Sequence, residues 1–347
     1  MMIDFKGHVP FLDGLRGIAV IMVFFFHCAP PQISSFFQFG WSGVDLFFVL
    51  SGFLITGILL DTKDSENYFK NFFARRFLRL FPLYYGILFV ILYVLPMLGH
   101  AMNNTQDILD SQIYYWTYTQ NILIALKGVP KFEGFMHFWS LAIEEQFYIF
   151  WPFIIRSLNK KKIIVLVVAG IGLSIILRNI NPFTPFASMF TLCRTEGLLL
   201  GGLAAILIRN PGSISKSVIY TGLIVSILAI VCMWLYNGSA NSNSLIFVRI
   251  GYTVTDFLCF FTLLFLFLRG KITSNLRELI ANRILRLAGK YSYGIYVYHA
   301  ILFWLLYNAQ VTSFQSFFAL STITILISVL SYHLYEKPFL SLKKHFK

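Results

Sequence analysis

The sequence predicts an all-α integral membrane protein that crosses the bilayer about ten times, with both termini in the cytoplasm. Hydrophobic residues make up 57% of the 347 residues and charged residues only 12%, whereas soluble domains carry about 25% charged residues. The apolar residues gather in runs of about 20, the length that a helix needs to cross a bilayer. The basic residues lie mainly between alternate runs, so membrane topology rather than nucleic-acid binding accounts for the net charge of +13.

Ten apolar runs are candidate spans. The predicted spans are 11–30, 41–60, 80–98, 137–155, 163–178, 188–208, 217–236, 246–268, 291–308 and 315–335. The aromatic stretch 113–126 is too short to span, so we expect it to lie at the interface or to re-enter the membrane. The sequence shows no internal repeat and no second soluble domain, so residues 1–347 are expected to form one transmembrane domain.

The orientation follows from the lysines and arginines of the connecting segments. When the N-terminus is placed inside, the outer segments hold only Lys127, Lys131, Arg178 and Arg249, and most of the other basic residues fall on the cytoplasmic side. The inner segment 269–290 alternates leucine and isoleucine with arginine. We therefore expect it to form an amphipathic helix on the inner membrane surface.

Two ionisable residues interrupt the first predicted span. Arg16 and His27 are 11 residues apart, which places them on one face of a helix and about 16 Å apart along its axis. Ionisable side chains within a span are costly and are candidates for a functional site. With the N-terminus inside, Arg16 lies near the cytoplasmic end and His27 near the outer end. The alternative is structural: Arg16 extends to the inner headgroups and His27 bonds a neighbouring helix.

Arg76 and Arg79 stand at the cytoplasmic end of the third predicted span, in the stretch FARRFLRLFPLYY. Their spacing of three residues puts both on one face of a helix. Two planar guanidinium groups at this end suit a phosphate-bearing ligand. The alternative is that they only anchor the cytoplasmic end of the span.

Two adjacent carboxylates lie in the fourth predicted span, HFWSLAIEEQFYIFWP. Glu144 is seven residues from His137, so the two share a helix face about 10 Å apart. Glu144 and its neighbour Glu145 are costly to bury without partners. The candidate partners for these carboxylates are Arg16, Arg194 and His27. A glutamate beside a histidine supplies the orienting group and the base that proton transfer requires, and structural ion pairing is the alternative.

The remaining polar residues of the apolar runs are expected to have structural roles. Gly43, Ser51 and Gly52 indicate close helix packing, and Ser51 lacks the Gly-x-Ser-x-Gly setting of a nucleophile. The residues expected to pack or to form ion pairs are His299, His333 and Glu336. The four cysteines have no paired spacing typical of a disulfide framework or a zinc site, so the sequence predicts no metal centre.

Taken together, these stretches resemble the acyltransferase-3 family, the integral-membrane acyltransferases that modify extracytoplasmic sugars. Four stretches match the family's pattern in order: LDGLRGIAVIMVFFFH, GVDLFFVLSGFLI, RRFLRLFPLYY and HFWSLAIEEQFYIFWP. YSYGIYVYHA and YEKPF match its closing motifs more loosely. Many members carry a further C-terminal hydrolase-like domain, and this sequence stops at Lys347. The resemblance therefore implies a stand-alone member.

The resemblance implies an O-acetyltransferase of the cell inner (plasma) membrane. Such a protein takes an acyl group, most often acetyl, from cytoplasmic acetyl-CoA and places it on a sugar hydroxyl outside. Arg76 and Arg79 would bind the phosphates of the donor, with Arg16 further in, and His27 would act as general base. The residue that fixes the tautomer of this histidine and stabilises the imidazolium would be Glu144 or Glu145. Direct transfer and an acyl-histidine intermediate are both open.

The implied partners are membrane lipid and a carbohydrate acceptor, and no nucleic acid. O-antigen, capsule, exopolysaccharide, peptidoglycan and a lipid-linked sugar all fit as acceptors, and a partner acyltransferase fits as the protein that completes the transfer. Two other function classes fit a ten-span chain. A transporter or flippase of a glycan or lipid intermediate would more often show repeated halves with broken helices. A non-catalytic partner of an envelope enzyme would not need Arg16, His27 and the glutamate pair together.

Overall fold

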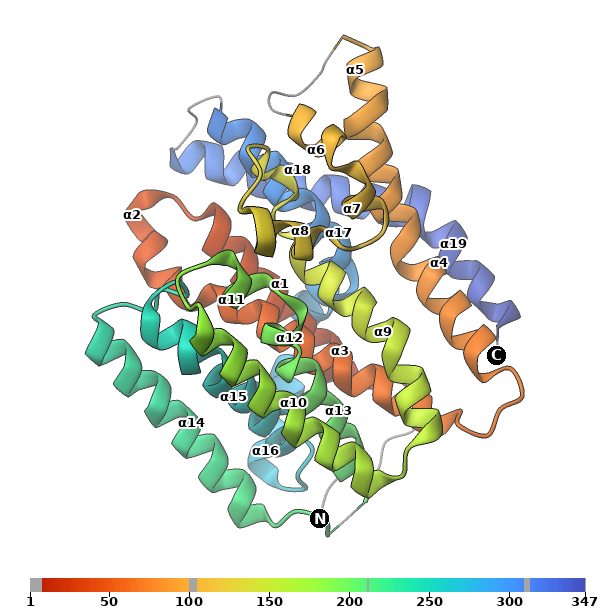
Figure 1. The fold of residues 1–347 in the computed structure, drawn as a ribbon, viewed down its shortest axis with the longest axis vertical. Helices are drawn as coiled ribbons and strands as arrows, with labels where there is room; N and C mark the ends of the chain where they lie inside the picture. The colour runs from red at the N-terminus through yellow and green to blue at the C-terminus, as the bar shows by residue number, and fades with distance from the viewer. Residues whose placement is uncertain (1–7, 100–104, 211, 309–312, 347) are drawn as a thin grey trace.

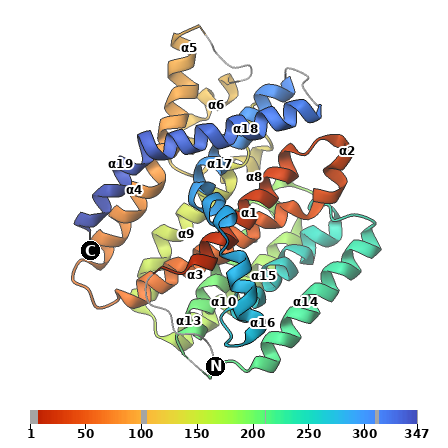
Figure 2. The same cartoon turned by 180° about the vertical axis from the view of Figure 1, so that it is seen from behind.

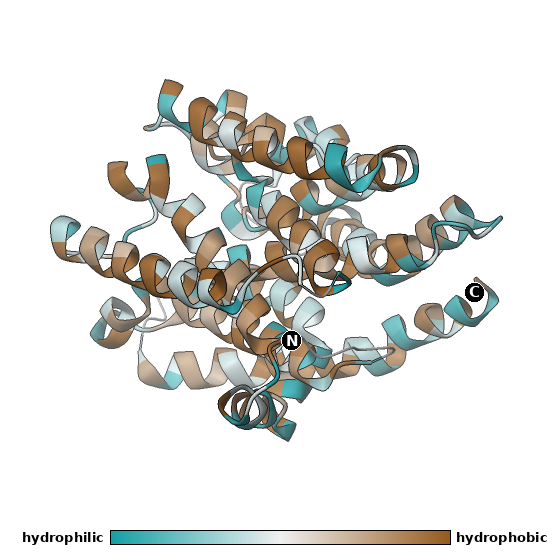
Figure 3. Ribbon diagram, turned by 90° about the horizontal axis from the view of Figure 1, so that it is seen from below, coloured by the Kyte–Doolittle hydropathy of each residue, from teal (hydrophilic) through white to brown (hydrophobic). Residues whose placement is uncertain are grey.

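A computed structural model describes residues 8–99, 105–210, 212–308 and 313–346. Over these ranges the chain consists of helices and their connections, without strands. Apolar residues run along most of the helices, including faces that point outward (Figure 3). On α14 (Lys216–Asn237), for example, Val225, Leu228 and Leu235 are exposed, which is typical of a helix that faces lipid. These features confirm the predicted all-α membrane class.

Seven helical stretches of the described chain are long and apolar enough to cross a membrane. They are Pro10–Cys28, Pro31–Asp61, Tyr68–Met97, Lys160–Ile180, Lys216–Asn237, Phe247–Leu266 and Phe314–His345. A further long helix, α9 (Phe138–Ser157), is not among them because Glu144, Glu145 and Gln146 lower its mean hydropathy. The ten-span topology with both termini inside stays a prediction.

Most predicted spans coincide closely with helices. These helices are α1 (Pro10–Cys28), α3 (Ser42–Asp61), α9, α10 (Lys160–Ile180), α14 and α15 (Tyr252–Leu266), the last preceded by η4 (Phe247–Gly251). The stretch 113–126 forms two short helices, α7 (Gln112–Trp116) and α8 (Gln120–Lys127), too short to span as predicted. The other short elements are α2 (Pro31–Ser34), η1 (Ser35–Trp41), α6 (Gln106–Asp110) and η3 (Glu133–Phe135).

Three helices extend beyond the predicted runs. The third span begins twelve residues early, as α4 (Tyr68–Phe89), and continues through η2 (Val90–Val94) and α5 (Leu95–Met97). The predicted amphipathic segment 269–290 is divided between α16 (Lys271–Ile280) and the start of α17 (Arg283–Asn308). The tenth span, α18 (Phe314–Ser331), continues through η5 (Tyr332–Glu336), α19 (Lys337–Ser341) and η6 (Leu342–His345). These extensions contain polar residues, so the apolar runs of the sequence do not predict them.

The prediction of one continuous helix over 188–208 is wrong. The chain here forms three pieces, α11 (Pro185–Met189), α12 (Thr191–Arg194) and α13 (Glu196–Ile208). Phe190 is extended between the first two pieces, and Thr195 separates the last two. Arg194 and Glu196, on either side of Thr195, have buried partners that are described below.

The central helices determine where the polar side chains meet. α1 and α3 lie in the middle, with α9 on one side of α3 and α15 on the other (Figure 1). α17 lies along α1 and is crossed by α18, as Figure 2 shows from behind. At one edge α14 packs on α15, and at the opposite edge α4 runs beside α19. The centre of the molecule is therefore built from α1, α3, α9 and α17.

Glycines bring α1 and α17 into backbone contact. A Cβ atom on Gly17 would lie 2.1 Å from the carbonyl oxygen of Leu285, and one on Gly289 would lie 1.9 Å from that of Asp13. Only glycine permits so close an approach. The two helices are parallel, because Gly17 meets Gly289 and, ten residues further along each helix, His27 meets His299.

A Gly289→Val substitution is expected to destabilise the protein by at least about 1–3 kcal/mol, because its side chain must push α17 away from the α1 backbone. The effect is measured as a fall in the thermal unfolding midpoint of the protein in lipid nanodiscs. Gly172→Val is the matched control, since a Cβ atom on this glycine of α10 meets no atom within 4 Å. Equal midpoints for the two variants would contradict the glycine contact.

Candidate active site

Two neighbouring cavities lie between the central helices. The first, of about 70 Å³, is called the arginine cavity and is lined by Arg16, Arg76 and Arg79 among others. The second, of about 530 Å³, is called the histidine cavity and is lined by His27 and His137 among others. Val44 of α3 and Tyr296 of α17 line both cavities. The two cavities therefore adjoin at these two side chains.

Positive charge is concentrated in the arginine cavity. Arg16 comes from α1, and Arg76 and Arg79 come from one face of α4, as their spacing predicts. Within the described chain, none of the three donates a hydrogen bond or forms an ion pair. The buried Nε atoms of Arg16 and Arg76 lack hydrogen-bond partners. Because neighbouring guanidinium groups repel one another, the cavity suits an anion with several oxygen atoms.

Glu144 of α9 is the one carboxylate among the residues that line the arginine cavity. Its Oε1 atom accepts a hydrogen bond of 2.8 Å from Ser51 Oγ on α3. Ser51 therefore orders a carboxylate in addition to packing between helices. With three arginines and one glutamate, the charge of the lining stays positive.

Glu145 lies on another side of α9. It lines a third cavity, of about 480 Å³, between α4 and α9, and its Oε1 atom is buried without a partner in the described chain. It does not line the arginine cavity or the histidine cavity. Neither Glu144 nor Glu145 makes a hydrogen bond to His27 in the described structure, so these contacts do not support a glutamate as the group that fixes its tautomer.

The histidine cavity combines aromatic walls with polar groups. Its aromatic lining residues, besides Tyr296 at the junction, are Phe26, Trp41, Trp139, Tyr252, Phe303 and Trp304. The polar lining residues besides the two histidines include Glu133, Ser188, Arg194, Ser242 and Asn243. A volume of about 530 Å³ lies in the range of small-ligand sites. The lining suits a ring-shaped ligand with apolar faces and hydroxyl groups at its edge.

His27 is half-buried in the last turn of α1 and lines the histidine cavity. Its Nδ1 atom lies 3.1 Å from the carbonyl oxygen of Val23. A carbonyl only accepts hydrogen bonds, so we assign the proton to Nδ1. The Nε2 atom then carries a free lone pair, as a base requires.

His299 is the site residue that the sequence analysis missed. Its Nε2 atom lies 3.2 Å from His27 Nδ1, and its ring centre lies 5.2 Å from those of His27 and His137. The sequence contains a signal for this contact: Gly17 precedes His27 by ten residues, and Gly289 precedes His299 by ten. This equal spacing predicts a contact between the two histidines only once the contact between Gly17 and Gly289 is known.

Tyr296 is held across the junction of the two cavities. Its hydroxyl donates to the carbonyl oxygen of His137 at 2.8 Å and lies 2.5 Å from Ser140 Oγ. Val44 faces the same junction from α3 and is buried. Arg16 and His27, which are predicted to share one helix face, each line one of the two cavities. The junction at Val44 and Tyr296 lies between these cavities.

Comparison with known proteins identifies the chain's family. The model of the acyltransferase domain family, acyltransferase 3, matches residues 9–333. The chain belongs to this acyltransferase family. No solved structure matches it.

Curated relatives of this acyltransferase-family chain carry related names. Peptidoglycan O-acetyltransferase OatA of Listeria monocytogenes is 29% identical over 85% of this chain and 49% of that protein. O-acetyltransferase OatA of Staphylococcus aureus is 28% identical over 84% of this chain and 50% of that protein. A Staphylococcus aureus protein with the provisional name O-acetyltransferase is 30% identical over 96% of this chain and 57% of that protein. The chain therefore spans about half the length of the curated relatives it matches.

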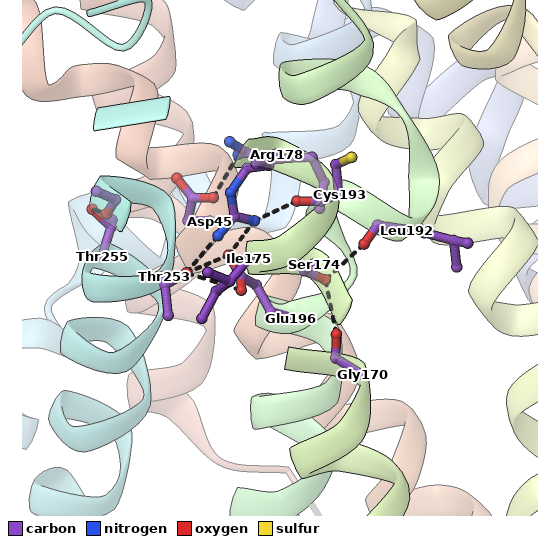
Figure 4. A network of polar contacts seen from close by, with 12 residues as sticks. Asp45, Gly170, Ser174, Ile175, Arg178, Leu192, Cys193, Glu196, Thr253 and Thr255 are labelled. Carbon is purple, nitrogen blue, oxygen red and sulfur yellow. Dashed lines mark hydrogen bonds and ion pairs between the residues drawn. The ribbon is translucent and has the colours of Figure 1, made fainter. Parts of the chain in front are cut away.

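The acyltransferase-family chain also contains a buried ion-pair network where the predicted sixth span breaks (Figure 4). Arg194 bonds Asp45 through Nη2 and Oδ1 at 2.6 Å, so it does not pair with either predicted glutamate. Arg178 of α10 bonds Glu196 at 2.7 Å and Thr253 Oγ1 at 2.5 Å. Arg178 and Glu196 are fully buried. The network connects α3, α10, α12, α13 and α15 beside the histidine cavity.

An Arg178→Met substitution is expected to destabilise this acyltransferase-family chain by about 3–5 kcal/mol, because it leaves the Glu196 carboxylate buried without its cation. Chemical unfolding in detergent micelles measures the change. Arg209→Met is the control, since Arg209 pairs with Asp61 at 2.7 Å where both side chains are partly exposed, and exposed pairs contribute at most about 1 kcal/mol. A loss at Arg178 no larger than at Arg209 would contradict a structural role for the network.

Proposed function

We propose that this chain carries out the membrane step of an O-acetyltransferase, moving an acetyl group from cytoplasmic acetyl-CoA to a hydroxyl of an envelope carbohydrate. One observation carries the proposal: unpaired arginines line one cavity, histidines line the next, and the two adjoin at Val44 and Tyr296. The arrangement supplies an anion site, a base and a short route between them. The family membership and the names of the relatives support the same activity.

The arginine cavity would hold the donor. Coenzyme A carries a pyrophosphate and a further phosphate, and guanidinium groups bind such oxygens through paired hydrogen bonds. A cavity of about 70 Å³ has no room for the nucleotide, so the phosphates would stay at the mouth beside Arg76 and Arg79. The narrow thioester end would then pass Arg16 toward Tyr296. The donor side faces the cytoplasm if α1 enters from the cytoplasm, as the distribution of basic residues indicates.

The histidine cavity would hold the acceptor. Its aromatic walls can stack on a sugar ring while polar side chains bond the hydroxyl groups. Two of the relatives are named OatA, and one of these is named for peptidoglycan. An envelope glycan is accordingly the acceptor class that we propose.

His27 would act as the general base of the transfer. Its free Nε2 lone pair accepts the proton of the sugar hydroxyl while the hydroxyl oxygen attacks the thioester carbonyl carbon. The carbon–sulfur bond then breaks, and the leaving sulfur receives the proton from His27. The products are the sugar acetate ester and free coenzyme A, so neither an oxidant nor a metal ion is needed for balance. Glu144, which bonds Ser51 in the arginine cavity, belongs in this mechanism to the donor side.

Substitution of both cavity arginines tests the donor assignment. In lipid nanodiscs, an Arg76→Gln/Arg79→Gln variant is expected to raise the KM for acetyl-CoA at least tenfold, because hydrogen bonds between charged groups are lost. Release of free thiol measures the rate. Arg75→Gln is the control, since exposed Arg75 bonds the backbone oxygen of Phe346 and does not line the cavity. An unchanged KM in the double variant, or an equal rise in the control, would count against the proposal.

The broken helix α11–α13 is the observation that favours a transporter as the second candidate, since interrupted helices line many transport sites. The same nanodisc assay separates the two functions. An acyltransferase releases thiol from acetyl-CoA and transfers label to a glycan acceptor. A transporter moves the glycan across a vesicle membrane and releases no thiol.

A further inference from the structure

We infer that His299 is a positioning residue that holds the imidazole of His27 in the protonation state required of a base. His299 is buried, with only 1% of its surface exposed, and it does not line the histidine cavity. It therefore cannot touch an acceptor bound there and must act through His27. The inference deepens the proposed function and rests on it for the effect on turnover, whereas the contact between the two rings can be tested without turnover.

Hydrogen-bond partners fix the proton of His299. Its Nδ1 atom lies 2.7 Å from the carbonyl oxygen of Tyr296 and 3.1 Å from that of Ile295. Because both partners only accept, Nδ1 carries the proton and Nε2 carries a lone pair. This lone pair lies 3.2 Å from His27 Nδ1, which is protonated because it also lies 3.1 Å from the carbonyl oxygen of Val23. The contact is thus a hydrogen bond from His27 Nδ1 to His299 Nε2.

This bond has two consequences for His27. It makes Nδ1 the protonated nitrogen and leaves Nε2 free at the cavity. It also fixes the orientation of the His27 ring. The Val23 carbonyl alone would hold the ring less firmly, because its oxygen already accepts the helical N–H of residue 27. When Nε2 takes up a proton, the Nδ1–H bond to the His299 lone pair becomes charge-assisted and stronger. His299 therefore supplies what the sequence analysis assigned to a glutamate.

The backbone fold keeps the two rings together. Gly17 and Gly289 hold α1 and α17 in contact. The two histidines lie ten residues further along their helices, almost three turns away. The ring of His299 also meets that of His137, whose Nε2 atom lies 3.2 Å from the carbonyl oxygen of Val297. With contacts to both rings and hydrogen bonds at Nδ1, the His299 ring has little freedom to rotate away from His27.

Nitrogen NMR tests the bond directly. The full chain, labelled with ¹⁵N-histidine in lipid nanodiscs, is compared with His27→Gln and His299→Gln variants to assign the two rings. The expected result is a protonated His27 Nδ1, an unprotonated His27 Nε2, and a ¹⁵N–¹⁵N coupling across the bond to His299 Nε2. A His27 ring protonated on Nε2, or the absence of the coupling from well-resolved signals, would overturn the inference.

Turnover distinguishes positioning from packing. His299→Leu keeps apolar bulk but has no acceptor, so kcat is expected to fall about tenfold, the size of one lost hydrogen bond, with the KM for acetyl-CoA unchanged. His299→Gln offers an amide oxygen near the former Nε2 position and is expected to recover most of that loss. A packing role would produce the reverse order, with leucine tolerated better than glutamine, and would overturn the inference.

A control separates this test from the proposed function. His333→Leu changes an exposed histidine that accepts or donates one hydrogen bond, at 3.1 Å, with the Tyr291 hydroxyl and also meets the Tyr332 ring. It lines neither of the two cavities, so kcat should stay at the wild-type value. If a His27→Gln variant keeps full transfer, the base assignment fails and the kinetic part of the inference fails with it. The ring-to-ring coupling would still stand in that case, because it is measured on resting protein.

Discussion

A His27→Gln variant is expected to lose acetyl transfer by about 10²–10⁴-fold, the usual contribution of a general base. Glutamine keeps a similar size and polarity, so α1 should still insert and pack, but an amide does not accept the proton of a sugar hydroxyl. Because His27 lines the histidine cavity and not the arginine cavity, the dissociation constant for acetyl-CoA should stay within about threefold of the wild type. Thiol release with a glycan acceptor and equilibrium binding of the donor measure the two quantities.

The matched substitution for this experiment is His333→Gln, at an exposed histidine of η5 that is expected to keep wild-type transfer. His137→Gln is the informative comparison, since His137 lines the same cavity. The Nδ1 atom of His137 is buried and has no hydrogen-bond partner among the residues that the structure describes, so it is poorly placed to meet a substrate. If the His27→Gln variant keeps near-normal transfer and the His137→Gln variant loses most of it, the general base is His137 and not His27.

The sequence predicted the helices well because apolar runs of span length leave few other structures in a membrane. It also predicted which polar residues share a helix face, since that depends only on spacing within one helix. Arg16 and His27 line adjoining cavities from α1, and Arg76 and Arg79 line one cavity together from α4. For these residues, the helical periodicity of the sequence was sufficient to predict which side chains share a helix face.

Contacts between helices were not predictable in the same way. Glu144 and Glu145 are adjacent in sequence, yet they line different cavities because neighbouring residues on a helix point about 100° apart. Arg194 pairs with Asp45 next to the interruption at Thr195, and no proline or glycine occupies that position. His299 was assigned a structural role because its partner lies 272 residues away. For Arg194 and His299, a tertiary contact rather than a local preference decided the outcome.

A Val44→Trp variant is expected to abolish acetyl transfer, by at least about 100-fold, while it still binds acetyl-CoA. Val44 and Tyr296 are the side chains that line both cavities, and an indole ring in place of the valine would fill the junction. Reaction requires the attacking oxygen to come within about 3–3.5 Å of the thioester carbon, and small displacements cost orders of magnitude in rate. A blocked junction keeps the two reactants in separate cavities.

The size of the side chain at position 44 provides the internal control. Val44→Ala widens the junction and should keep transfer, whereas Val44→Ile is expected to give an intermediate rate. Overpacking also carries a stability cost, about 1–3 kcal/mol, so each variant's unfolding midpoint is measured beside its donor affinity. A folded Val44→Trp protein that binds acetyl-CoA and transfers at the wild-type rate would show that the acetyl group travels by another path. A graded loss of transfer with residue volume, at constant donor affinity, would locate the transfer at the meeting point of the two cavities, because nothing at position 44 contributes a charge, a proton or a nucleophile.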